Sequence, residues 1–169
     1  RLNVGTVADF EEWYRGGVSR AADGTVFYWP YSRSDAALTK LEASTFSGTA
    51  IDVSAGGNSL GYTWCAVLDT GGVECWGYGN QGQLGDGTTE DRATPVAVAG
   101  LTGDATDVDC GYLHSCAVSD DGVWCWGYNG YGGLGDGTTS TRYTAVETQS
   151  LSGTVEAVSS GIYYTCALL

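Results

Sequence analysis

Short runs of alternating apolar and polar residues, divided by glycine-rich turns, fill most of the chain. Residues 115–118 and 123–126 form two such runs, and the Asp121-Gly122 pair between them is typical of a tight β-hairpin. The chain offers no credible long helix. The pattern therefore predicts an all-β chain with about four short strands in every 50 residues.

One stretch of the sequence recurs after 50 residues. Residues 75–89 return as residues 125–139, and the match extends without a gap from 72–119 to 122–169. Of these 48 aligned positions, 22 are identical. A fixed period of this size indicates a repeat architecture. A unit of about four strands suits a propeller blade, so we expect an all-β fold, a β-propeller built of four-stranded blades.

The first repeat departs from this pattern. Residues 19–29 again indicate strand, Asp-Gly turn and strand, so residues 1–18 occupy the place of the strand that precedes a hairpin. The glycine-rich stretch is missing after Trp29. We therefore divide the chain into a degenerate first repeat, residues 1–46, and more regular propeller repeats, residues 47–169, which end within a blade.

About three repeats are present, whereas closed propellers typically have about 4–8 blades. Residues 161–169 begin one more hairpin and stop before its turn, which leaves an apolar strand without a partner. The sequence thus predicts part of a larger propeller or one that a second chain completes. Of the two, we favour a chain that continues beyond Leu169.

Four of the six cysteines lie in pairs on the predicted hairpins. With a two-residue tip at residues 120–121, Cys116 faces Cys125 in a non-hydrogen-bonded pair, where a cross-strand disulfide can close. A three-residue tip places Cys65 opposite Cys75 by the same count. We therefore predict two hairpin disulfides, with free buried thiols as the alternative.

The other hairpins bear on this assignment. In the first hairpin, Arg20 and Tyr28 stand in the places of the two cysteines. Both cysteines are therefore absent together, as expected if they are bonded to each other. Metal ligation is disfavoured because no second Cys-x-x-Cys or His cluster completes a site. Cys110 and Cys166 are left without an assigned partner. Paired disulfides imply an oxidising compartment, hence an extracellular or cell-surface protein.

The chain is strongly acidic, with 20 Asp and Glu residues against seven Lys and Arg and a net charge of −13. Nucleic-acid affinity depends on cationic contacts to phosphate, so this charge argues against DNA, RNA and anionic membranes as partners. It is compatible with cationic partners. No run approaches the ~18–20 apolar residues that a membrane span needs.

The repeated motif resembles a known family. In the third repeat it is Gly-x-x-His-Ser-x-Ala-Val at 111–118, Asp-Gly-x-x-x-Trp-Gly at 121–127 and Gly-x-Leu-Gly-Asp-Gly-Thr at 132–138. This pattern resembles the regulator of chromosome condensation repeat, and the resemblance is strongest over residues 72–169. Members of that family form β-propellers from repeats of about this length, which implies the same fold here.

The resemblance implies less about function, because propellers of one kind host unrelated roles. The founder of the family acts as a nucleotide-exchange factor for a small GTPase and binds chromatin. The acidic charge and the predicted disulfides argue against that role for this chain. The sequence instead resembles the secreted, cysteine-bearing microbial versions, and some relatives in this fold act only by binding another protein.

Several side chains that could carry chemistry have structural interpretations. His114 is the only histidine, and we expect it to pack or hydrogen-bond rather than to act in catalysis. Asp86 and Asp136 lie in matched loops, where one carboxylate per loop is too few for calcium and an Asx-type turn is expected. Trp29, Trp76 and Trp126 recur at one repeat position and are predicted to pack in the core or between blades.

The tyrosine- and asparagine-containing glycine loops are what remains for binding, although packing within the loops is the competing interpretation. We predict a non-catalytic extracellular module for macromolecular binding or surface assembly, with no catalytic residue, cofactor or metal. Its partners would be a protein, a glycan or other copies of itself. The alternatives are a structural subunit of a filament or appendage and a surface hydrolase with an unidentified carboxylate site. The candidate binding residues are Tyr78, Asn80, Tyr128, Asn129 and Tyr131.

Overall fold

The structure is a computed structural model that describes residues 7–13, 16–29, 39–41, 45–120, 122–149 and 151–169. These residues form antiparallel β-sheets, in which strands that follow one another in the sequence are also neighbours in the sheet.

The first blade consists of β1 (Val7–Trp13), β2 (Gly16–Ala21), β3 (Val26–Trp29) and β4 (Thr39–Leu41). The second consists of β5 (Ala50–Asn58), β6 (Gly61–Leu68), β7 (Val73–Gly77) and β8 (Arg92–Ala97). The third consists of β9 (Ala105–Cys110), β10 (His114–Ser119), β11 (Gly122–Gly127) and β12 (Arg142–Glu147), and a final pair of β13 (Ala157–Ser160) and β14 (Thr165–Leu168) follows.

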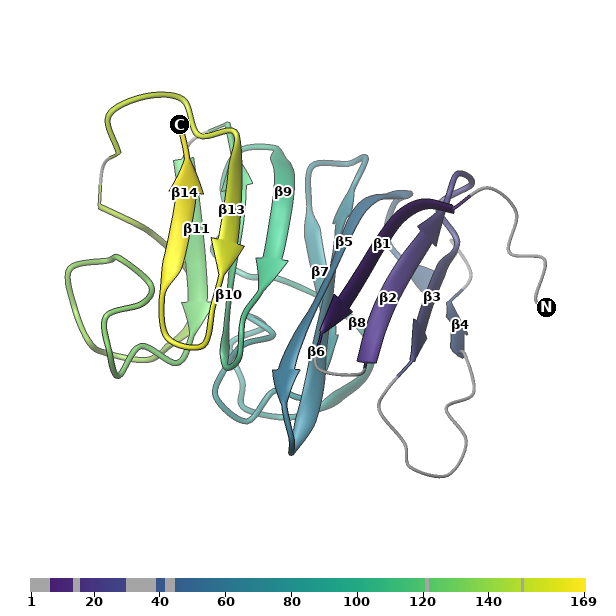
Figure 1. Ribbon diagram of the computed structural model, residues 1–169, viewed down its shortest axis with the longest axis horizontal. Helices are drawn as coiled ribbons and strands as arrows, with labels where there is room; N and C mark the ends of the chain where they lie inside the picture. Colours follow the sequence, from purple (N-terminus) through teal and green to yellow (C-terminus); the bar gives the residue numbers. More distant parts are fainter. Residues whose placement is uncertain (1–6, 14–15, 30–38, 42–44, 121, 150) are drawn as a thin grey trace.

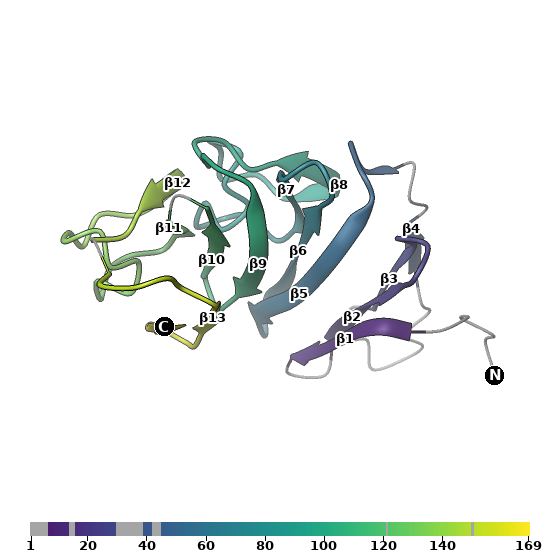
Figure 2. The ribbon, with the colours of Figure 1, turned by 90° about the horizontal axis from the view of Figure 1, so that it is seen from above.

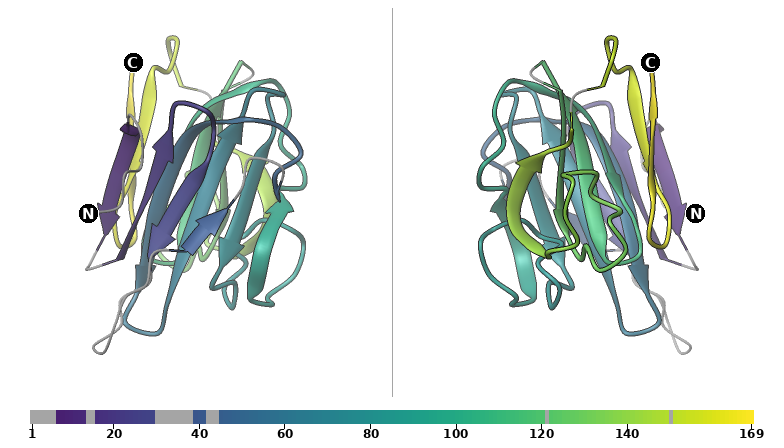
Figure 3. Two further views of the ribbon diagram at one scale, coloured as in Figure 1. Left: turned by 90° about the vertical axis from the view of Figure 1, so that its right-hand side faces the viewer. Right: turned by 90° about the vertical axis from the view of Figure 1, so that its left-hand side faces the viewer.

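The blades stand side by side as in a segment of a propeller (Figure 1). Their first strands adjoin one another, because β1 contacts β5, β5 contacts β9 and β9 contacts β13. Seen from above, the later strands of each blade lead away from this inner row (Figure 2). Figure 3 looks at the segment from its two ends, with the first blade towards the viewer on the left, and the third blade towards the viewer on the right with the pair β13–β14 at its edge. The prediction of four-stranded blades in an incomplete propeller is confirmed.

Aspartate side chains join the inner strands of successive blades. Asp52 on β5 accepts a hydrogen bond from the main-chain N–H of Val108 at 3.2 Å, and Asp107 on β9 accepts one from Val158 at 2.8 Å. A neighbouring carboxylate, Asp109, accepts from the N–H of Ser160. Main-chain N–H groups that have no strand partner on this side are thereby satisfied. Side-chain to main-chain bonds therefore join the inner strands, which do not form a continuous sheet, and main-chain bonds such as Gly57 N–H to Gly111 O at 2.9 Å add to them.

Tryptophan fills both interfaces between complete blades, with Trp64 and Trp76 in the first and Trp126 in the second. Trp76 on β7 is buried with Val18 and Val26 of the first blade, and Trp126 on β11 is buried with Leu84 and Val73 of the second. Burying large aromatic side chains supplies much of the stabilisation available to a core of this size. The predicted packing role of Trp76 and Trp126 is confirmed, whereas Trp29 is half-buried and is not among the described residues of either cluster.

The hairpin of the third blade has the pairing that its sequence predicts. Cys116 faces Cys125, and the two form a disulfide. Cys65 and Cys75 face one another in the second blade and are likewise bonded. All four side chains are fully buried. Cys110 is a buried thiol whose Sγ lies 3.8 Å from the carbonyl oxygen of Ser54.

The first hairpin differs from the alignment on which its prediction rests. Tyr28 faces Val18, whereas Arg20 faces Val26. The main-chain N–H of Ala21 bonds to Thr25 at 2.9 Å, so residues 22–24 form the tip, whereas pairing Arg20 with Tyr28 would place the tip at residues 23–25. This change moves the pairing by two residues along β2. The assignment of Arg20 to the place of the first cysteine is therefore wrong, and buried Val18 takes that place.

Candidate functional site

The loop after β7 is built on an Asx-type turn. Asp86 accepts hydrogen bonds from the main-chain N–H of Thr88 at 2.9 Å and from its hydroxyl at 2.8 Å. Arg92, the first residue of β8, donates from Nε to the other carboxylate oxygen at 2.7 Å. The carboxylate therefore fastens the loop to the outer strand of its own blade. The Asx-type turn expected for Asp86 is confirmed.

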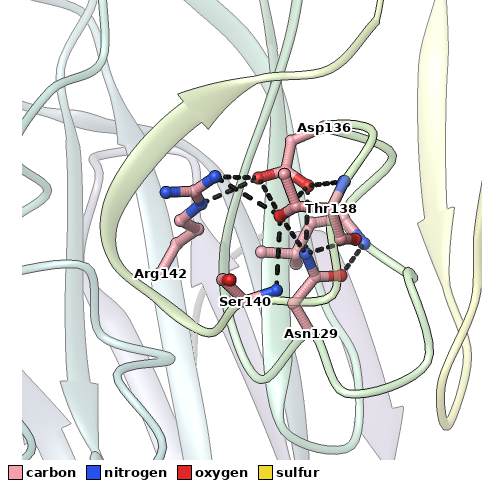
Figure 4. A network of polar contacts seen from close by, with 6 residues as sticks. Asn129, Asp136, Thr138, Ser140 and Arg142 are labelled. Atoms are coloured by element: carbon pink, nitrogen blue, oxygen red, sulfur yellow. Dashed lines mark hydrogen bonds and ion pairs between the residues drawn. The ribbon is translucent and has the colours of Figure 1, made fainter.

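The loop after β11 repeats this arrangement and adds a buried amide (Figure 4). Asp136 again accepts from Thr138, at 2.9 Å, and from Arg142 Nε, at 2.7 Å. The Asn129 amide donates to Asp136 at 3.0 Å, and its carbonyl oxygen accepts from the N–H of Leu134 at 3.1 Å. Asn129 is fully buried, so this predicted binding residue supports the loop from inside.

The hydrogen bonds in the two loops lower the pKa values of Asp86 and Asp136. Burial alone would raise the pKa of Asp86, but hydrogen bonds from Thr88 and Arg92 outweigh it and hold the pKa below its ordinary value. The same balance lowers the pKa of Asp136, where the partners are Thr138 and other donors of the loop. Both carboxylates are therefore ionised near neutral pH and fixed by donors. They act as structural clamps within the loops.

Four tyrosines from three segments meet beside the glycine loop of the third blade, which follows β11 and is called the third glycine loop below. Tyr128 and Tyr131 belong to that loop, Tyr112 to the β9–β10 turn and Tyr163 to the β13–β14 turn. Tyr131 and Tyr163 have ring centroids 4.6 Å apart, and the other neighbouring pairs are 6.1 Å apart. Tyr131 is 69% exposed and Tyr163 is 41% exposed. We call these four residues the tyrosine cluster.

The second blade does not build such a cluster. Tyr78 packs over Gly61, where its ring leaves no room for a side chain, and its hydroxyl meets the amide of Asn80. Asn80 is exposed. The five predicted binding residues are thus distributed over two loops, and only Tyr128 and Tyr131 lie together in an exposed group.

Two ionisable side chains lie between the third blade and the final pair, the buried His114 and the half-buried Asp109. His114 Nε2 lies 3.0 Å from the hydroxyl of Thr165, and burial lowers the pKa of His114 to about 4. Burial raises the pKa of Asp109 to about 6, although donors such as Ser160 and Ser54 oppose the rise. The expected hydrogen-bonding role of His114 is confirmed. Both groups join adjacent blades.

Several residues of the loop clamps and of the tyrosine cluster were not predicted from the sequence. Arg92 and Arg142 are identical across the repeat, six residues after each loop aspartate, and that regularity could have identified them. Tyr112 and Tyr163 could not be found in this way, because their repeat equivalents are Ile162 and Leu113. The tyrosine cluster is therefore peculiar to the third blade and not a property of the repeat.

Neither a metal-binding cluster nor a membrane-spanning helix occurs among the described residues. Among them no group of three or more His, Cys, Asp and Glu side chains could hold a metal ion. The described part of the chain also contains no helix long and apolar enough to cross a membrane.

Blades of four antiparallel strands, arranged around a common inner row, define the chain as part of a β-propeller. Residues 70–118 and 120–168 each match the Regulator of chromosome condensation (RCC1) repeat, and residues 105–132 match a second description of that repeat. Since the two repeats span more than half of the sequence, the chain belongs to the RCC1 repeat family. The resemblance seen in the sequence is confirmed.

Known proteins share either a short segment or the fold. A stretch of 55 residues, 31% of the chain, is 46% identical to E3 ubiquitin-protein ligase HERC2 of Homo sapiens, and it covers 1% of that protein. Human WBSCR16 superposes with a TM-score of 0.78 at 23% identity, over 95% of this chain and 44% of that one. Prp20p of Saccharomyces cerevisiae superposes with a TM-score of 0.76 at 12% identity, over 95% and 43%. The chain thus spans less than half of these structures, and likeness at such identity shows the fold alone.

Proposed function

We propose that the chain is a non-catalytic, extracellular β-propeller module that binds a protein through the tyrosine cluster. The main support for this proposal is the exposed pair of Tyr131 and Tyr163. Their ring centroids lie 4.6 Å apart although the residues come from different blades. Tyrosine is enriched at the centres of protein interfaces, where it combines a large apolar ring with a hydroxyl group. Tyr112 and Tyr128 support the exposed pair from the side.

The charge of the chain favours a cationic protein as the partner. A net charge of −13 repels nucleic acids and acidic proteins and attracts basic surfaces. Related folds support a protein partner, since the crystal structure of Prp20p is described with its binding to Gsp1p and histones, and another shows Kap60 bound to the yeast protein. A glycan ligand and self-assembly are the competing proposals, and the experiment below separates them.

The two disulfides support a place outside the cytosol. Cys65–Cys75 and Cys116–Cys125 each close a hairpin and are fully buried. Such bonds form and persist in oxidising compartments and are rare in the cytosol. Mass spectrometry of the protein from its native source would test this. An intact mass lower by four hydrogens than that of the reduced chain supports the proposal, and fully reduced cysteines in the native protein contradict it.

The binding proposal is tested with immobilised chain and the extracellular protein fraction of its source. Tyr131→Ser combined with Tyr163→Ser should abolish retention of the partner, because both exposed rings are lost. Leu60→Ser is the matched control, since Leu60 is 77% exposed at the tip of the β5–β6 hairpin, outside the tyrosine cluster. Retention should weaken steeply with added salt if the partner is cationic.

The outcomes discriminate between the proposals. Loss of a protein band in the tyrosine variant alone supports the cluster as the binding site. Equal loss in the Leu60→Ser control, or no protein retained by the wild-type chain, contradicts it. Retention that glycosidase treatment of the fraction removes points to a glycan, and retention of the chain itself points to self-assembly.

A further inference from the structure

Tyr131 and Tyr163 have the closest rings of the tyrosine cluster. Their ring centroids lie 4.6 Å apart with the planes tilted by 45°, whereas the other neighbouring pairs of the cluster have centroids 6.1 Å apart. At the shorter separation, carbon atoms of the two rings are in van der Waals contact. Both side chains are also exposed, at 69% and 41%. The two phenol rings are therefore within reach of each other and of a reagent in solution.

Main-chain contacts hold the two residues in this position. Tyr163 lies in the β13–β14 turn, where the N–H of Gly161 donates to the carbonyl oxygen of Tyr164 at 2.8 Å. The N–H of Tyr112 donates to the carbonyl oxygen of Gly161 at 3.2 Å, which fixes the turn against the third blade. A Cβ at Gly133, in the third glycine loop, would lie 2.6 Å from the carbonyl oxygen of Tyr163. The turn therefore packs directly on the loop, and the ring contact is built into the interface between the blades.

This place in the interface stays accessible between two complete blades. The repeat equivalents of Tyr131 and Tyr163 are Gln81 and Leu113, which belong to the second and third blades. Both are partly exposed although all four strands of the third blade are in place. The exposure of the tyrosine pair is therefore a property of its position in the blade interface.

Two phenol rings in contact can be joined by oxidation. Loss of one electron and the hydroxyl proton converts a tyrosine to a phenoxyl radical, whose unpaired electron is shared between the oxygen and the neighbouring Cε carbons. Two such radicals couple through one Cε of each ring. The hydrogen of each coupled carbon then moves to the oxygen of its ring, so both rings are aromatic again. The pair loses two electrons and two protons in total, and the product is dityrosine.

We propose that Tyr131 and Tyr163 form a site of oxidative crosslinking, at which hydrogen peroxide and a haem peroxidase join the two rings as dityrosine. One molecule of hydrogen peroxide accepts the two electrons and two protons and leaves as two molecules of water. The new carbon–carbon bond links the third glycine loop to the β13–β14 turn. Unlike the two disulfides, it is not cleaved by thiols. This modification goes beyond protein binding at the tyrosine cluster and does not rest on it.

Other exposed tyrosines lack a second ring to couple with. Tyr143 is 46% exposed and Tyr164 is 63% exposed, so both are open to the same oxidant. In the described part of the chain, neither has a neighbouring aromatic ring. A radical on either residue would couple only with a second molecule. The product within one molecule should therefore join Tyr131 to Tyr163.

The crosslink is tested on the purified chain in dilute solution with hydrogen peroxide and a haem peroxidase. Dityrosine fluorescence follows the reaction, and free tyrosine treated in parallel shows that the oxidant is active. Intact mass is measured after thiol reduction, which opens every disulfide in treated and untreated chains alike. We expect a monomer that is lighter than the reduced, untreated chain by two hydrogens. Proteolysis and mass spectrometry should place the new bond between Tyr131 and Tyr163.

Conservative variants separate this pair from the other tyrosines. Tyr131→Phe and Tyr163→Phe each keep the ring and its packing but remove the hydroxyl group that the oxidant needs. Either change alone should abolish the crosslinked monomer. Tyr143→Phe and Tyr164→Phe are the matched controls, because they remove an exposed hydroxyl group outside the pair. Both controls should form the product at the wild-type rate.

The crosslink should also stabilise the fold. The bond between Tyr131 and Tyr163 closes a loop that includes β12 and β13, and it restricts the unfolded chain as a disulfide does. The oxidised wild-type chain should therefore unfold at a higher urea concentration than the untreated chain. Oxidised Tyr131→Phe should show no such shift.

Four results would overturn the proposal. They are no product from the wild-type chain while free tyrosine couples, dityrosine that occurs only in covalent dimers, a bond that maps to another pair of tyrosines, and an undiminished yield from Tyr131→Phe. None of them bears on protein binding, because the oxidation is measured on the purified chain and the phenylalanine variants keep both rings. Loss of partner retention in the serine variants, in turn, says nothing about crosslinking, so the two proposals fail separately.

Discussion

The indole Nε1 of Trp126 donates a hydrogen bond of 2.8 Å to the main-chain carbonyl of Gln83, 43 residues earlier and in the preceding blade. The hydroxyl of Ser115 bonds to the same carbonyl at 3.1 Å. Two blades that share no sheet are thus joined by a buried polar contact inside an apolar interface. A buried carbonyl group that loses its hydrogen-bond donors costs free energy of folding. The two hydrogen bonds to Gln83 therefore fix the position of one blade against the next.

Replacing Trp126 by Phe should therefore destabilise the chain by about 2–4 kcal/mol, from lost packing and a poorly satisfied carbonyl. Trp124→Phe is the matched control, because among the described residues the Trp124 Nε1 has no hydrogen-bond partner. It should cost about 1–3 kcal/mol less than Trp126→Phe. Urea unfolding followed by circular dichroism measures both, and equal losses would contradict a role for the bond.

Removing the third-blade disulfide should also destabilise the chain. Cys116 and Cys125 are nine residues apart, so the double replacement by Ala should cost about 2–3 kcal/mol through the larger entropy of the unfolded chain. Cys166→Ser should leave the unfolding midpoint unchanged, since Cys166 is exposed and outside both disulfides. A midpoint that drops equally in both variants would show that the bond does not stabilise the fold.

The buried amide of Asn129 makes a sharper test of loop architecture. Asn129→Ala leaves the N–H of Leu134 without its acceptor and should cost about 2 kcal/mol, with local loosening of the third loop. Asn80→Ala removes an exposed amide of the second loop and should be nearly neutral. Hydrogen exchange at Leu134 reports the loosening directly. Unchanged protection there would mean that Asn129 does not organise the loop.

These networks show which features the sequence could predict. The pairing of Cys116 with Cys125 and the Asx-type turn at Asp136 depend on neighbouring residues and recur in the repeat, so counting and pattern were sufficient. The tip of the first hairpin lies one residue earlier than the alignment implied, which displaced the assignment of Arg20 by two residues along β2. The position of a tip depends on main-chain geometry that an Asp-Gly pair does not determine.

Contacts between blades were less accessible to sequence reasoning. Asp109 and Ser160 are 51 residues apart, and Tyr131 and Tyr163 are brought together only because successive blades adjoin. The tyrosine pair has no equivalent in the second blade, and the Asp109–Ser160 bond recurs there with a different acceptor, since the N–H of Cys110 donates to Ser54 Oγ at 3.1 Å. Such contacts follow from the angle and spacing of the blades, which the hydrophobic pattern leaves open. The predicted binding loops contribute two of the four residues of the tyrosine cluster, Tyr128 and Tyr131, and their role in binding stays a prediction.

Asp109 should make the chain more stable as pH falls. Burial raises its folded pKa to about 6, above the ordinary value of 3.8, so the folded chain binds the proton more tightly than the unfolded chain. The contribution grows as pH falls through 6 towards 3.8 and reaches at most about 3 kcal/mol. Asp109→Asn should remove this gain, and unfolding free energies between pH 7 and pH 4.5 measure it. Equal slopes for the variant and the wild-type chain would contradict the prediction.

His114 should have the opposite effect over nearly the same range. Its folded pKa is lowered to about 4 by burial, so below pH 6.5 the unfolded chain binds the proton more tightly and stability falls with pH. The two contributions, each about 3 kcal/mol in full, should nearly cancel and leave the wild-type chain insensitive to pH between about 6 and 4.5. Asp86 and Asp136 do not change stability in this pH range, because their pKa values are lowered and their contributions to the free energy of unfolding are lost only below about pH 4.

Asp109→Asn should therefore lose stability on acidification, whereas His114→Gln, which keeps a polar group near Thr165, should gain stability. A wild-type chain with a steep dependence, or variants whose slopes share one sign, would show that the two groups do not oppose each other.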